Sequence, residues 1–440
     1  MIQDVDLIVI GAGPGGYEVA AHEVASGKKV VVIEKDLLGG TCLNRGCIPT
    51  KCLCAGADAL HAIEDAAQFG VKTSRIEASY AEALLRSKDV VATLRDGIRS
   101  LLSKCTLIEG EAVIHADGSV WVEDNGFKAP KVIIATGSKP AGLHIKGCEY
   151  AVNSDEFLEI DQLPKKIVIV GGGVIGMEFA YIAKTYGSEV TVIEYCKEIL
   201  PPFDAEVAKR LRLSLVSTGL SIETSAKVSE IRKKSEKLEV LYTDKKGEQC
   251  VEADMVIMAV GRSAVVPDGL SDAGIQVNER GFIVTDGNME TTRPGFYAVG
   301  DCNGRLMLAH VATAQSMLCI GQNINLDVVP SAVFVRPEIA MVGLTTEQCK
   351  EKGLEYVTKK ALYRANGKAL ASGHSEGFVK VLVSPATGEI LGCHILGAHA
   401  SDLIQEVVLA MAHGLSAEQV AKQTIHGHPT LSEIIASALG

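Results

Sequence analysis

The sequence lacks the features of several protein classes. It has no basic run long enough to bind nucleic acid, and 43 Lys and Arg against 54 Asp and Glu give a net charge of −11. No apolar run approaches the ~18–20 residues that span a membrane, and the N-terminus has no basic region of the kind that opens a secretory signal. We therefore expect a cytoplasmic globular protein that binds neither nucleic acid nor membranes.

Cysteine is too sparse for a small secreted scaffold held together by disulfides, with 12 among 440 residues. Most are scattered along the chain, as is typical of buried thiols in a reducing compartment. The exceptions are Cys42, Cys47, Cys52 and Cys54, which lie close together. At about 150 residues per domain, the length predicts about three domains.

The chain contains two copies of one motif. The first copy begins DLIVIGAGPGGYEVA and ends KKVVVIEK, and the second begins KIVIVGGGVIGMEFA and ends SEVTVIEY. The first glycines (171 − 11) and the final acids (194 − 34) are both 160 residues apart. Each copy predicts a buried parallel strand, a glycine turn, a helix and a second strand. The first strands are expected at Leu7–Ile10 and Ile167–Val170.

The three glycines of each G-x-G-x-x-G pattern have separate roles. The first makes the tight turn, the second lets the backbone approach a pyrophosphate, and the third lets the helix pack on the strand. The helix N-terminus adds N–H groups and a partial positive charge. A single pattern also fits an ordinary glycine-rich turn, but the complete unit found twice predicts two dinucleotide sites. These glycines are Gly11, Gly13 and Gly16, and Gly171, Gly173 and Gly176.

An acidic residue ends the second strand of each copy. Glu34 and Glu194 lie 23 residues beyond the first glycine (34 − 11 and 194 − 171), where a carboxylate can accept hydrogen bonds from a ribose diol. Glu194 favours NAD over NADP because it would repel a 2′-phosphate. Lys197 follows closely, so the preference is not absolute.

The rest of the chain is less regular. Residues 132–140 and 255–262 read as strands followed by glycine turns, and 294–302 as a strand that brings Asp301 to a cofactor. From about Ser331 the pattern predicts an antiparallel α+β domain with helices on one side. Leu403, Val407, Val408 and Met411 form a core or interface stripe of that domain.

Cys42 and Cys47 are five residues apart. In a regular helix their Cα atoms would be roughly 8.6 Å apart, whereas a disulfide needs less than about 7 Å. A bond between them requires a distorted helix turn, which Gly46 permits. Such a bond is expected to be labile and suits a redox catalyst. Pro49 fits an early helical position, where a nearby thiol has a lowered pKa.

Two other interpretations of the cluster are a zinc site and unrelated buried thiols. The C-x₄-C spacing provides neither the C-x₂-C pairs nor the four ligands of a zinc site, so no metal is predicted. Lys51 lies four residues after Cys47 on the same helix face and can stabilise a thiolate or a reduced flavin. Cys52 and Cys54 are predicted to be packing residues.

Residues 424–435, TIHGHPTLSEII, form the second candidate site. Pro429 disfavours helix at His428 and suits the start of a helix over 431–436. Glu433 can then reach back to orient the imidazole of His428, as a general base requires. A helix-capping histidine, or a metal pair with His426, fits these residues as well.

The segments GGTCLNRGCIPTK, GGGVIGMEFA, YAVGDC and HPTLSE resemble the FAD-dependent pyridine nucleotide–disulfide oxidoreductases, and the resemblance covers essentially the whole chain. It implies an α/β fold with two Rossmann-like FAD/NAD(P)-binding domains and a C-terminal α+β dimerisation domain. Cys42 would exchange with substrate and Cys47 would face the flavin. His428, paired with Glu433, would be the general base and would come from the partner subunit of a homodimer.

The resemblance also implies domain boundaries and cofactor contacts. The FAD domain would comprise 1–141 and a central segment 264–330, the NAD domain 142–263, and the interface domain 331–440. Glu178 would pair with Lys51 beside the nicotinamide, although an acid there also suits the helix dipole. The implied FAD contacts are Gly11, Gly13, Pro14, Gly15, Gly16, Glu34, Lys35, Gly40, Thr41, Lys51, Ala112, Thr136, Gly137, Ser138, Asp301, Met307, Leu308, Ala309 and His310. The implied NAD contacts are Gly171, Gly172, Gly173, Val174, Ile175, Gly176, Glu178, Glu194, Val228, Gly261 and Arg262.

Within the family, the motifs are most similar to those of members that reoxidise protein-bound dihydrolipoamide, passing electrons through the Cys42–Cys47 disulfide and FAD to NAD⁺. The implied partner is a lipoylated protein of a 2-oxoacid dehydrogenase, acetoin or glycine cleavage complex. The alternatives are a glutathione- or mercuric-reductase-like enzyme and a non-catalytic scaffold. The sequence ends ASALG without the C-terminal cysteine pair of mercuric reductases.

Overall fold

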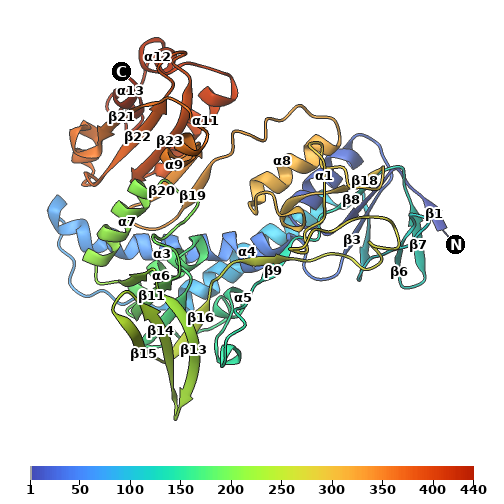
Figure 1. Cartoon of the computed structure of the whole chain (residues 1–440), viewed down its shortest axis with the longest axis horizontal. Helices are drawn as coiled ribbons and strands as arrows, with labels where there is room; N and C mark the ends of the chain where they lie inside the picture. The colour runs from blue at the N-terminus through green and yellow to red at the C-terminus, as the bar shows by residue number, and fades with distance from the viewer. Residues whose placement is uncertain (1) are drawn as a thin grey trace. The chain divides into compact units, whose positions relative to one another are not determined.

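The computed structural model describes residues 2–440 and has the predicted mixed α/β fold (Figure 1). The chain forms two compact units, each built from three separate segments. The first contains residues up to 52, 82–141 and 261–326, and the second contains 53–81, 142–260 and 327–440. The finer division into FAD, NAD and interface domains remains a prediction. Within residues 2–440, no helix has both the length and the apolar character needed to cross a membrane.

The first unit holds a parallel sheet, a smaller sheet and the helices around them. Its strands are β1 (Ile2–Asp4), β2 (Leu7–Ile10), β3 (Val30–Glu34), β4 (Thr106–Glu109), β5 (Val113–Ile114), β6 (Val120–Val122), β7 (Asn125–Lys128), β8 (Val132–Ile134), β9 (Ser138–Pro140), β17 (Arg262–Ala264) and β18 (Phe296–Ala298). Its helices are α1 (Pro14–Ala25), α2 (Gly40–Arg45), most of α4 (Tyr80–Leu101) and α8 (Ala309–Cys319). Helix α3 (Cys47–Asp65) begins in this unit and continues into the second.

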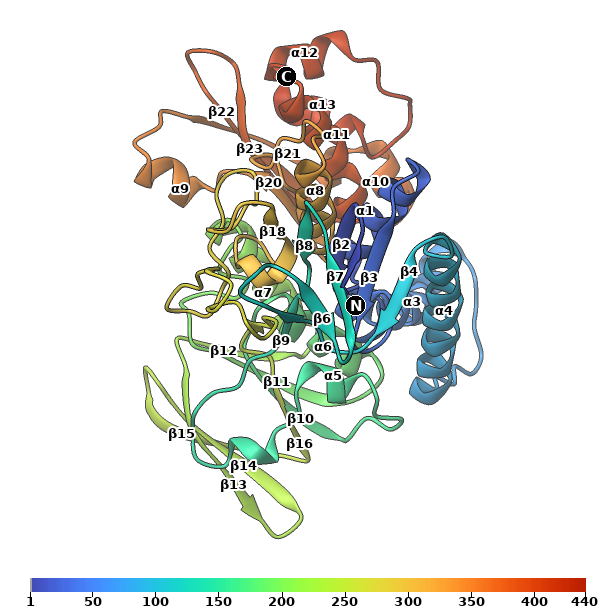
Figure 2. The same ribbon diagram turned by 90° about the vertical axis from the view of Figure 1, so that its right-hand side faces the viewer.

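Strand β2 lies at the centre of the parallel sheet, whose order is β18-β8-β2-β3-β4 (Figure 2). All four of its residues are buried, as the continuous apolar run predicts. Because side chains alternate along a strand, Ile8 and Ile10 join one core cluster while Leu7 and Val9 join the cluster on the other face. The predicted first strand is therefore confirmed.

The second unit contains one parallel sheet, two antiparallel sheets and the helices around them. Its strands are β10 (Lys166–Val170), β11 (Glu189–Glu194), β12 (Ser221–Thr224), β13 (Lys227–Lys234), β14 (Lys237–Asp244), β15 (Gly247–Ala253), β16 (Met255–Met258), β19 (Ser331–Val333), β20 (Ile339–Gly343), β21 (Val357–Leu362), β22 (Gly377–Val383) and β23 (Ile390–Gly397). Its helices are α5 (Ser154–Phe157), α6 (Val174–Thr185), α7 (Ala205–Ser217), α9 (Thr346–Glu351), α10 (Gly367–Ala371), α11 (Ala400–Ala412), α12 (Ala417–Gln423) and α13 (Glu433–Leu439).

The second copy of the repeat forms a four-stranded parallel sheet in the order β12-β11-β10-β16. Strand β10 is bordered by β11 and β16, as β2 is bordered by β3 and β8 in the first unit. The antiparallel strands β13, β14 and β15 follow as a separate ladder (Figure 1). The two motif copies thus fold in the same way.

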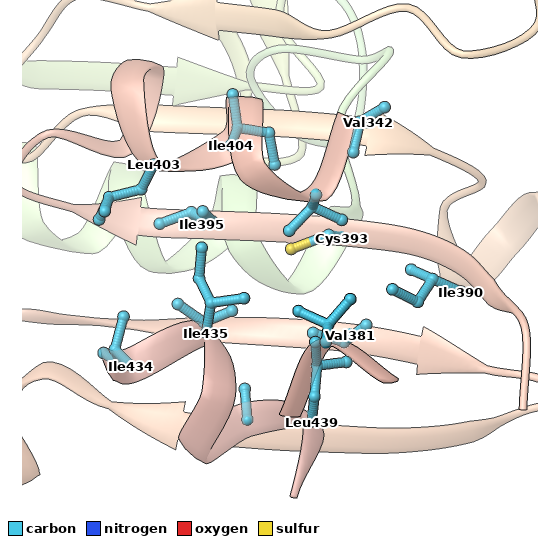
Figure 3. Packing of buried hydrophobic residues seen from close by; sticks show 14 of the residues in the cluster. Val342, Val381, Ile390, Cys393, Ile395, Leu403, Ile404, Ile434, Ile435 and Leu439 are labelled. Carbon is cyan, nitrogen blue, oxygen red and sulfur yellow. The ribbon is translucent and has the colours of Figure 1, made fainter. Parts of the chain in front are cut away.

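The C-terminal part is an antiparallel sheet in the order β19-β20-β23-β22-β21, with helices packed against it. Figure 3 shows side chains of α11 and α13 meeting residues of β22 and β23, including Val381 and Cys393. The α+β prediction for this part is confirmed. In the predicted stripe, Leu403 and Val407 are core residues, and Val408 and Met411 are partly buried against the same cluster.

A buried ion pair links α7 to the C-terminal sheet. Asp204, just before α7, is fully buried and accepts two hydrogen bonds from Lys380 of β22, at 2.8 and 2.9 Å. Its carboxylate also accepts bonds from the backbone N–H and the hydroxyl of Thr346. Burial raises the pKa of Asp204, but the bonds from Lys380 and Thr346 outweigh burial and hold this pKa below its usual value. The bonds from Lys380 and Thr346 thus favour the charged form of the buried carboxylate.

Removing the cation should leave that carboxylate buried and unpaired. We expect Lys380→Met to lower the free energy of unfolding by about 3–5 kcal/mol. Lys422→Met is the control, because Lys422 pairs with Glu418 at an exposed site on α12 and should contribute about 1 kcal/mol or less. Urea and thermal unfolding measure both. Equal losses in the two variants would contradict the prediction.

Candidate active site

The helix that carries the redox motif is interrupted between its two cysteines. Helix α2 ends at Arg45, and α3 begins at Cys47. Between them Gly46 has φ −148° and ψ −112°, far from helical values. A Cβ atom at Gly46 would lie 3.0 Å from the carbonyl oxygen of Thr41, so this turn favours glycine. The distortion that the cysteine spacing predicts is therefore present, and Pro49 occupies the third position of α3.

The interruption brings the side chains of Cys42 and Cys47 within hydrogen-bonding distance of each other. The hydrogen bond between them, followed by burial, raises the pKa of the Cys42 thiol, while the Lys51 ammonium acts in the opposite direction. Cys42 is half-buried, whereas Cys47 is exposed. Two sulfur atoms in contact across a helix break are suited to reversible disulfide formation.

Two residues that sequence reasoning missed hold α2 in place. The side-chain amide of Asn44 donates to the carbonyl oxygens of Leu38 and Gly40, at 3.0 and 2.9 Å. Its oxygen in turn accepts two hydrogen bonds from Arg95 of α4, at 3.0 and 2.6 Å. Asn44 lies between the two cysteines in the sequence, so its position could have marked it as a candidate site residue. No sequence pattern marks Arg95.

The first glycine loop has the backbone geometry that the motif predicts. Gly11 has φ +100°, which favours glycine. A Cβ atom at Gly16 would lie 1.9 Å from the Gly11 carbonyl oxygen, so only glycine allows α1 to pack this closely. At Gly13 the nearest atom would be 3.8 Å away, which leaves the room a pyrophosphate needs. Glu34 accepts hydrogen bonds from the backbone N–H groups of Ala12 and Asp36.

The second loop repeats this geometry in the other unit. Gly171 has φ +109°, and a Cβ atom at Gly176 would lie 2.0 Å from the Gly171 carbonyl oxygen. At Gly173 a Cβ atom would meet nothing within 4 Å. Glu194 accepts hydrogen bonds from the N–H groups of Gly172 and Cys196, both at 2.6 Å. Its carboxylate is thus fixed beside the loop, where a ribose would lie.

Further predicted residues meet in the first unit beside strand β8. Ser138 donates a hydrogen bond to Asp301 at 2.5 Å and accepts one from Arg262 at 2.7 Å. Thr136 donates to the carbonyl oxygen of Val265. Arg262, predicted as an NAD contact, lies in the same unit as the FAD candidates. Gln315, which sequence reasoning missed, is buried and accepts a hydrogen bond from the N–H of Gly300, next to Asp301.

The other implied FAD contacts also lie in the first unit. Lys35 pairs with Glu111 at 2.7 Å on the surface, and Ala112 is buried. Residues 307–310 lead into α8, with Leu308 at the N-cap and Ala309 as the first helical residue, and within the described chain no side chain caps this end. Its N–H groups are suited to bind an anionic group. The unit therefore gathers the FAD candidates Pro14, Gly15, Gly40, Thr41, Gly137, Met307, Leu308, Ala309 and His310.

The remaining NAD candidates lie in the second unit, except Gly261 and Arg262. Val174 and Ile175 begin α6, and Val228 is a core residue of β13. Glu178 is buried and accepts a hydrogen bond from the Phe334 N–H at 3.0 Å. Since Lys51 belongs to the first unit and Glu178 to the second, their pairing remains a prediction.

His428 and Glu433 form a pair near the C-terminus. Nδ1 of His428 lies 2.9 Å from Oε1 of Glu433, and Oε2 of Glu433 accepts a bond from the Thr430 N–H at 2.9 Å. Both bonds lower the pKa of the Glu433 carboxyl, and the bond from the Thr430 N–H contributes most. Helix α13 starts at Glu433, two residues later than predicted, and the residues before it form a tighter turn in which the N–H groups of Ile434 and Ile435 donate to the carbonyl oxygens of Leu431 and Ser432. The imidazole is 80% exposed, so it faces outward from this chain.

The remaining candidate residues are His426, Cys52 and Cys54. His426 lies 2.7 Å from Glu406 and does not pair with His428. Among residues 2–440 no group of three or more metal-ligating side chains is found. Cys54 is buried and its thiol donates to the Phe334 carbonyl oxygen, which is a packing role, while Cys52 is half-buried. His426 and His428 thus have separate carboxylate partners, Glu406 and Glu433.

Comparisons with known proteins agree with this geometry. The family model described as "Pyridine nucleotide-disulphide oxidoreductase" matches residues 5–316, and that of the corresponding dimerisation domain matches residues 329–439. The dihydrolipoyl dehydrogenase of Chlamydia pneumoniae is 37% identical over 99% of this chain and 96% of its own length. That of Bacillus subtilis (strain 168) is 37% identical over 100% of this chain and 98% of its own length.

Solved structures give a similar result. The Cu(II) complex of the HOCl-induced flavoprotein disulfide reductase RclA from Escherichia coli matches with a TM-score of 0.88 at 26% identity. The match covers 100% of this chain and 99% of RclA. The fold is thus shared along the whole length with a flavoprotein disulfide reductase.

The two glycine roles can be separated by substitution. Gly176→Ala should destabilise the protein by about 1–3 kcal/mol or more, because its methyl group meets the Gly171 carbonyl oxygen. Gly173→Ala should leave thermal stability nearly unchanged but weaken binding of the pyridine nucleotide, because the methyl group takes the space of the pyrophosphate. Thermal unfolding without nucleotide and titration with NADH measure the two effects. A stability loss at Gly173 equal to that at Gly176 would contradict the assignment.

Proposed function

The chain belongs to the pyridine nucleotide–disulphide oxidoreductase family, whose members bind FAD and a pyridine nucleotide, and we propose that it oxidises protein-bound dihydrolipoamide to lipoamide with NAD⁺ as acceptor. The observation that carries the substrate assignment is the full-length similarity to dihydrolipoyl dehydrogenases, at 37% identity against 26% for RclA. The contact between Cys42 and Cys47 across the Gly46 break supports disulfide chemistry at the N-terminal segment.

The cysteine pair and the histidine have complementary roles in this proposal. His428 takes the proton from one substrate thiol, and the resulting thiolate attacks Cys42 of the Cys42–Cys47 disulfide. The Cys42–Cys47 bond breaks, a mixed disulfide forms, and Cys47 leaves as a thiolate. The second substrate thiol then attacks the substrate sulfur of the mixed disulfide. This step breaks the bond to Cys42 and releases oxidised lipoamide. The proton of the second thiol passes to Cys42 through His428, and His428 retains one proton.

Charged side chains beside the reacting groups orient or stabilise them in this proposal. Glu433 fixes the Nδ1 side of His428, which leaves Nε2 to accept the substrate proton. Lys51 favours the thiolate form of the pair. FAD, held by the residues of the first motif copy, would supply two-electron transfer between the reduced cysteine pair and the nicotinamide. Glu178 would pair with Lys51 beside that ring.

The division of cofactors follows the two motif copies. We propose that residues 1–141 and 264–330 bind FAD, and that 142–263 bind NAD⁺. Gly13 and Gly173 leave the space for the pyrophosphates, while Glu34 and Glu194 are positioned for ribose. Glu194 is buried and fixed by two N–H groups, so a 2′-phosphate beside it would meet a carboxylate that cannot turn away. This arrangement supports NAD⁺ over NADP⁺.

The C-terminal dimerisation domain implies a homodimer. We propose that each active site combines Cys42 and Cys47 of one subunit with His428 and Glu433 of the other. The outward exposure of His428 in a single chain supports this arrangement, because the imidazole is available to a second subunit. The other partner would be a lipoylated protein of a 2-oxoacid dehydrogenase, acetoin or glycine cleavage complex, and we expect the cytoplasm as the compartment.

Turnover measurements test the substrate and coenzyme together. The protein should reduce NAD⁺ with dihydrolipoamide. The Glu194 carboxylate should repel the 2′-phosphate of NADP⁺ by several kcal/mol, so kcat/KM should be about a hundredfold or more higher with NAD⁺ than with NADP⁺. Cys47→Ser should abolish the reaction with dihydrolipoamide. A wild-type protein that instead reduces glutathione disulfide with NADPH, or a protein that purifies colourless, would contradict the proposal.

Mixing two inactive variants tests the shared site. Cys47→Ser and His428→Gln should each be inactive with dihydrolipoamide. After dissociation and random reassociation, half of the dimers are mixed and each has one intact site, so about a quarter of wild-type activity should return. If no activity returns although mixed dimers are detected by mass spectrometry, both residues come from one subunit.

A further inference from the structure

The loop that carries His428 is unusually exposed. This histidine loop, residues 424–432, joins α12 to α13. Ile425 is 98% exposed and the His428 side chain is 80% exposed. Leu431, at the C-terminal end of the loop, packs against the C-terminal core, whereas the part around His428 is held mainly by its polar contacts. Those contacts therefore decide where the imidazole lies.

One contact ties the loop to α11. Nε2 of His426 lies 2.7 Å from Oε1 of Glu406, and the His426 side chain is only 9% exposed. Helix α11 is a firm anchor because Leu403, Ile404 and Val407 belong to the C-terminal core. A hydrogen bond to a carboxylate in a nearly buried setting is stronger than one between neutral groups.

A second contact ties the loop to the start of α10. The side-chain amide of Asn366 donates to the Thr430 carbonyl oxygen at 3.0 Å. The Asn366 oxygen accepts the Ala369 N–H at 2.9 Å and so caps α10, which fixes the direction of the amide. Asn366 itself is buried, at 8% exposure.

The two contacts lie on either side of the catalytic candidate. His426 is two residues before His428, and Thr430 is two residues after it. We infer that Glu406 and Asn366 are positioning residues that hold His428 in place for proton transfer with the substrate thiol. This inference rests on the proposed function. Neither residue touches the substrate; each acts through the loop, whereas Glu433 contacts the imidazole directly.

A general base that moves by about 1 Å can lose on the order of a hundredfold in rate. Glu406→Ala should therefore lower kcat for dihydrolipoamide oxidation by about ten- to a hundredfold. Glu406→Gln should retain much of the activity, because its amide oxygen can still accept the bond from His426. Asn366→Asp should resemble Glu406→Ala, since it can keep the cap on α10 but loses the donor to Thr430. Glu418→Ala is the control, because Glu418 pairs with Lys422 on the exposed side of α12.

A second activity separates positioning from general damage. Reduction of ferricyanide by NADH needs the flavin and the nucleotide site but no proton transfer at His428. In the FAD-loaded dimer, Glu406→Ala and Asn366→Asp should leave this activity within about twofold of wild type, whereas dihydrolipoamide oxidation falls. Hydrogen exchange of the amides in 425–431 should become faster in both variants.

The outcomes separate failure of the positioning inference from failure of the proposed function. Unchanged dihydrolipoamide oxidation in Glu406→Ala, or unchanged exchange in 425–431, overturns the inference. Equal loss of both activities shows a structural role and also overturns it. A wild-type protein that reduces ferricyanide but does not oxidise dihydrolipoamide refutes the proposed function instead. In that case the exchange measurement still decides whether Glu406 and Asn366 hold the loop.

Discussion

Contact between the sulfur atoms of Cys42 and Cys47 depends on one interruption of a helix, and the proposed chemistry depends on that contact. A continuous helix would hold these residues too far apart for a bond, but Gly46 separates α2 from α3. Asn44 and Arg95 then fix the short helix on one side of the break. The reactive pair is thus created by backbone geometry and maintained by hydrogen bonds away from the sulfurs.

The two glycine loops have the same backbone geometry in both units. In each, the first glycine turns the chain and the third lets its helix touch the turn's own carbonyl oxygen. The middle glycine leaves open space, and the glutamate at the end of the next strand binds N–H groups of the loop. These features differ little between the copies, because the same steric limits apply wherever a helix N-terminus must approach a phosphate.

Much of this organisation could be predicted from the sequence. The strands Leu7–Ile10 and 167–170 follow from continuous apolar runs, and the break at Gly46 follows from the cysteine spacing. The antiparallel C-terminal sheet was also expected. Arg95, Gln315, Glu406 and Asn366 could not be found in this way. Each acts on a residue 15 to 64 positions away in the chain, and no local pattern marks such a partner.

The sequence by itself determined the chemistry that is available: two dinucleotide loops, a pair of thiols five residues apart, and a histidine with a glutamate on the same short segment. These features depend on covalent spacing, so they can be read along the chain. Only the tertiary structure decided how firmly each group is held and what surrounds it. Burial, the alignment of hydrogen bonds and the pairing of Asp204 with Lys380 arise when distant segments meet, and their free energies depend on water being excluded there.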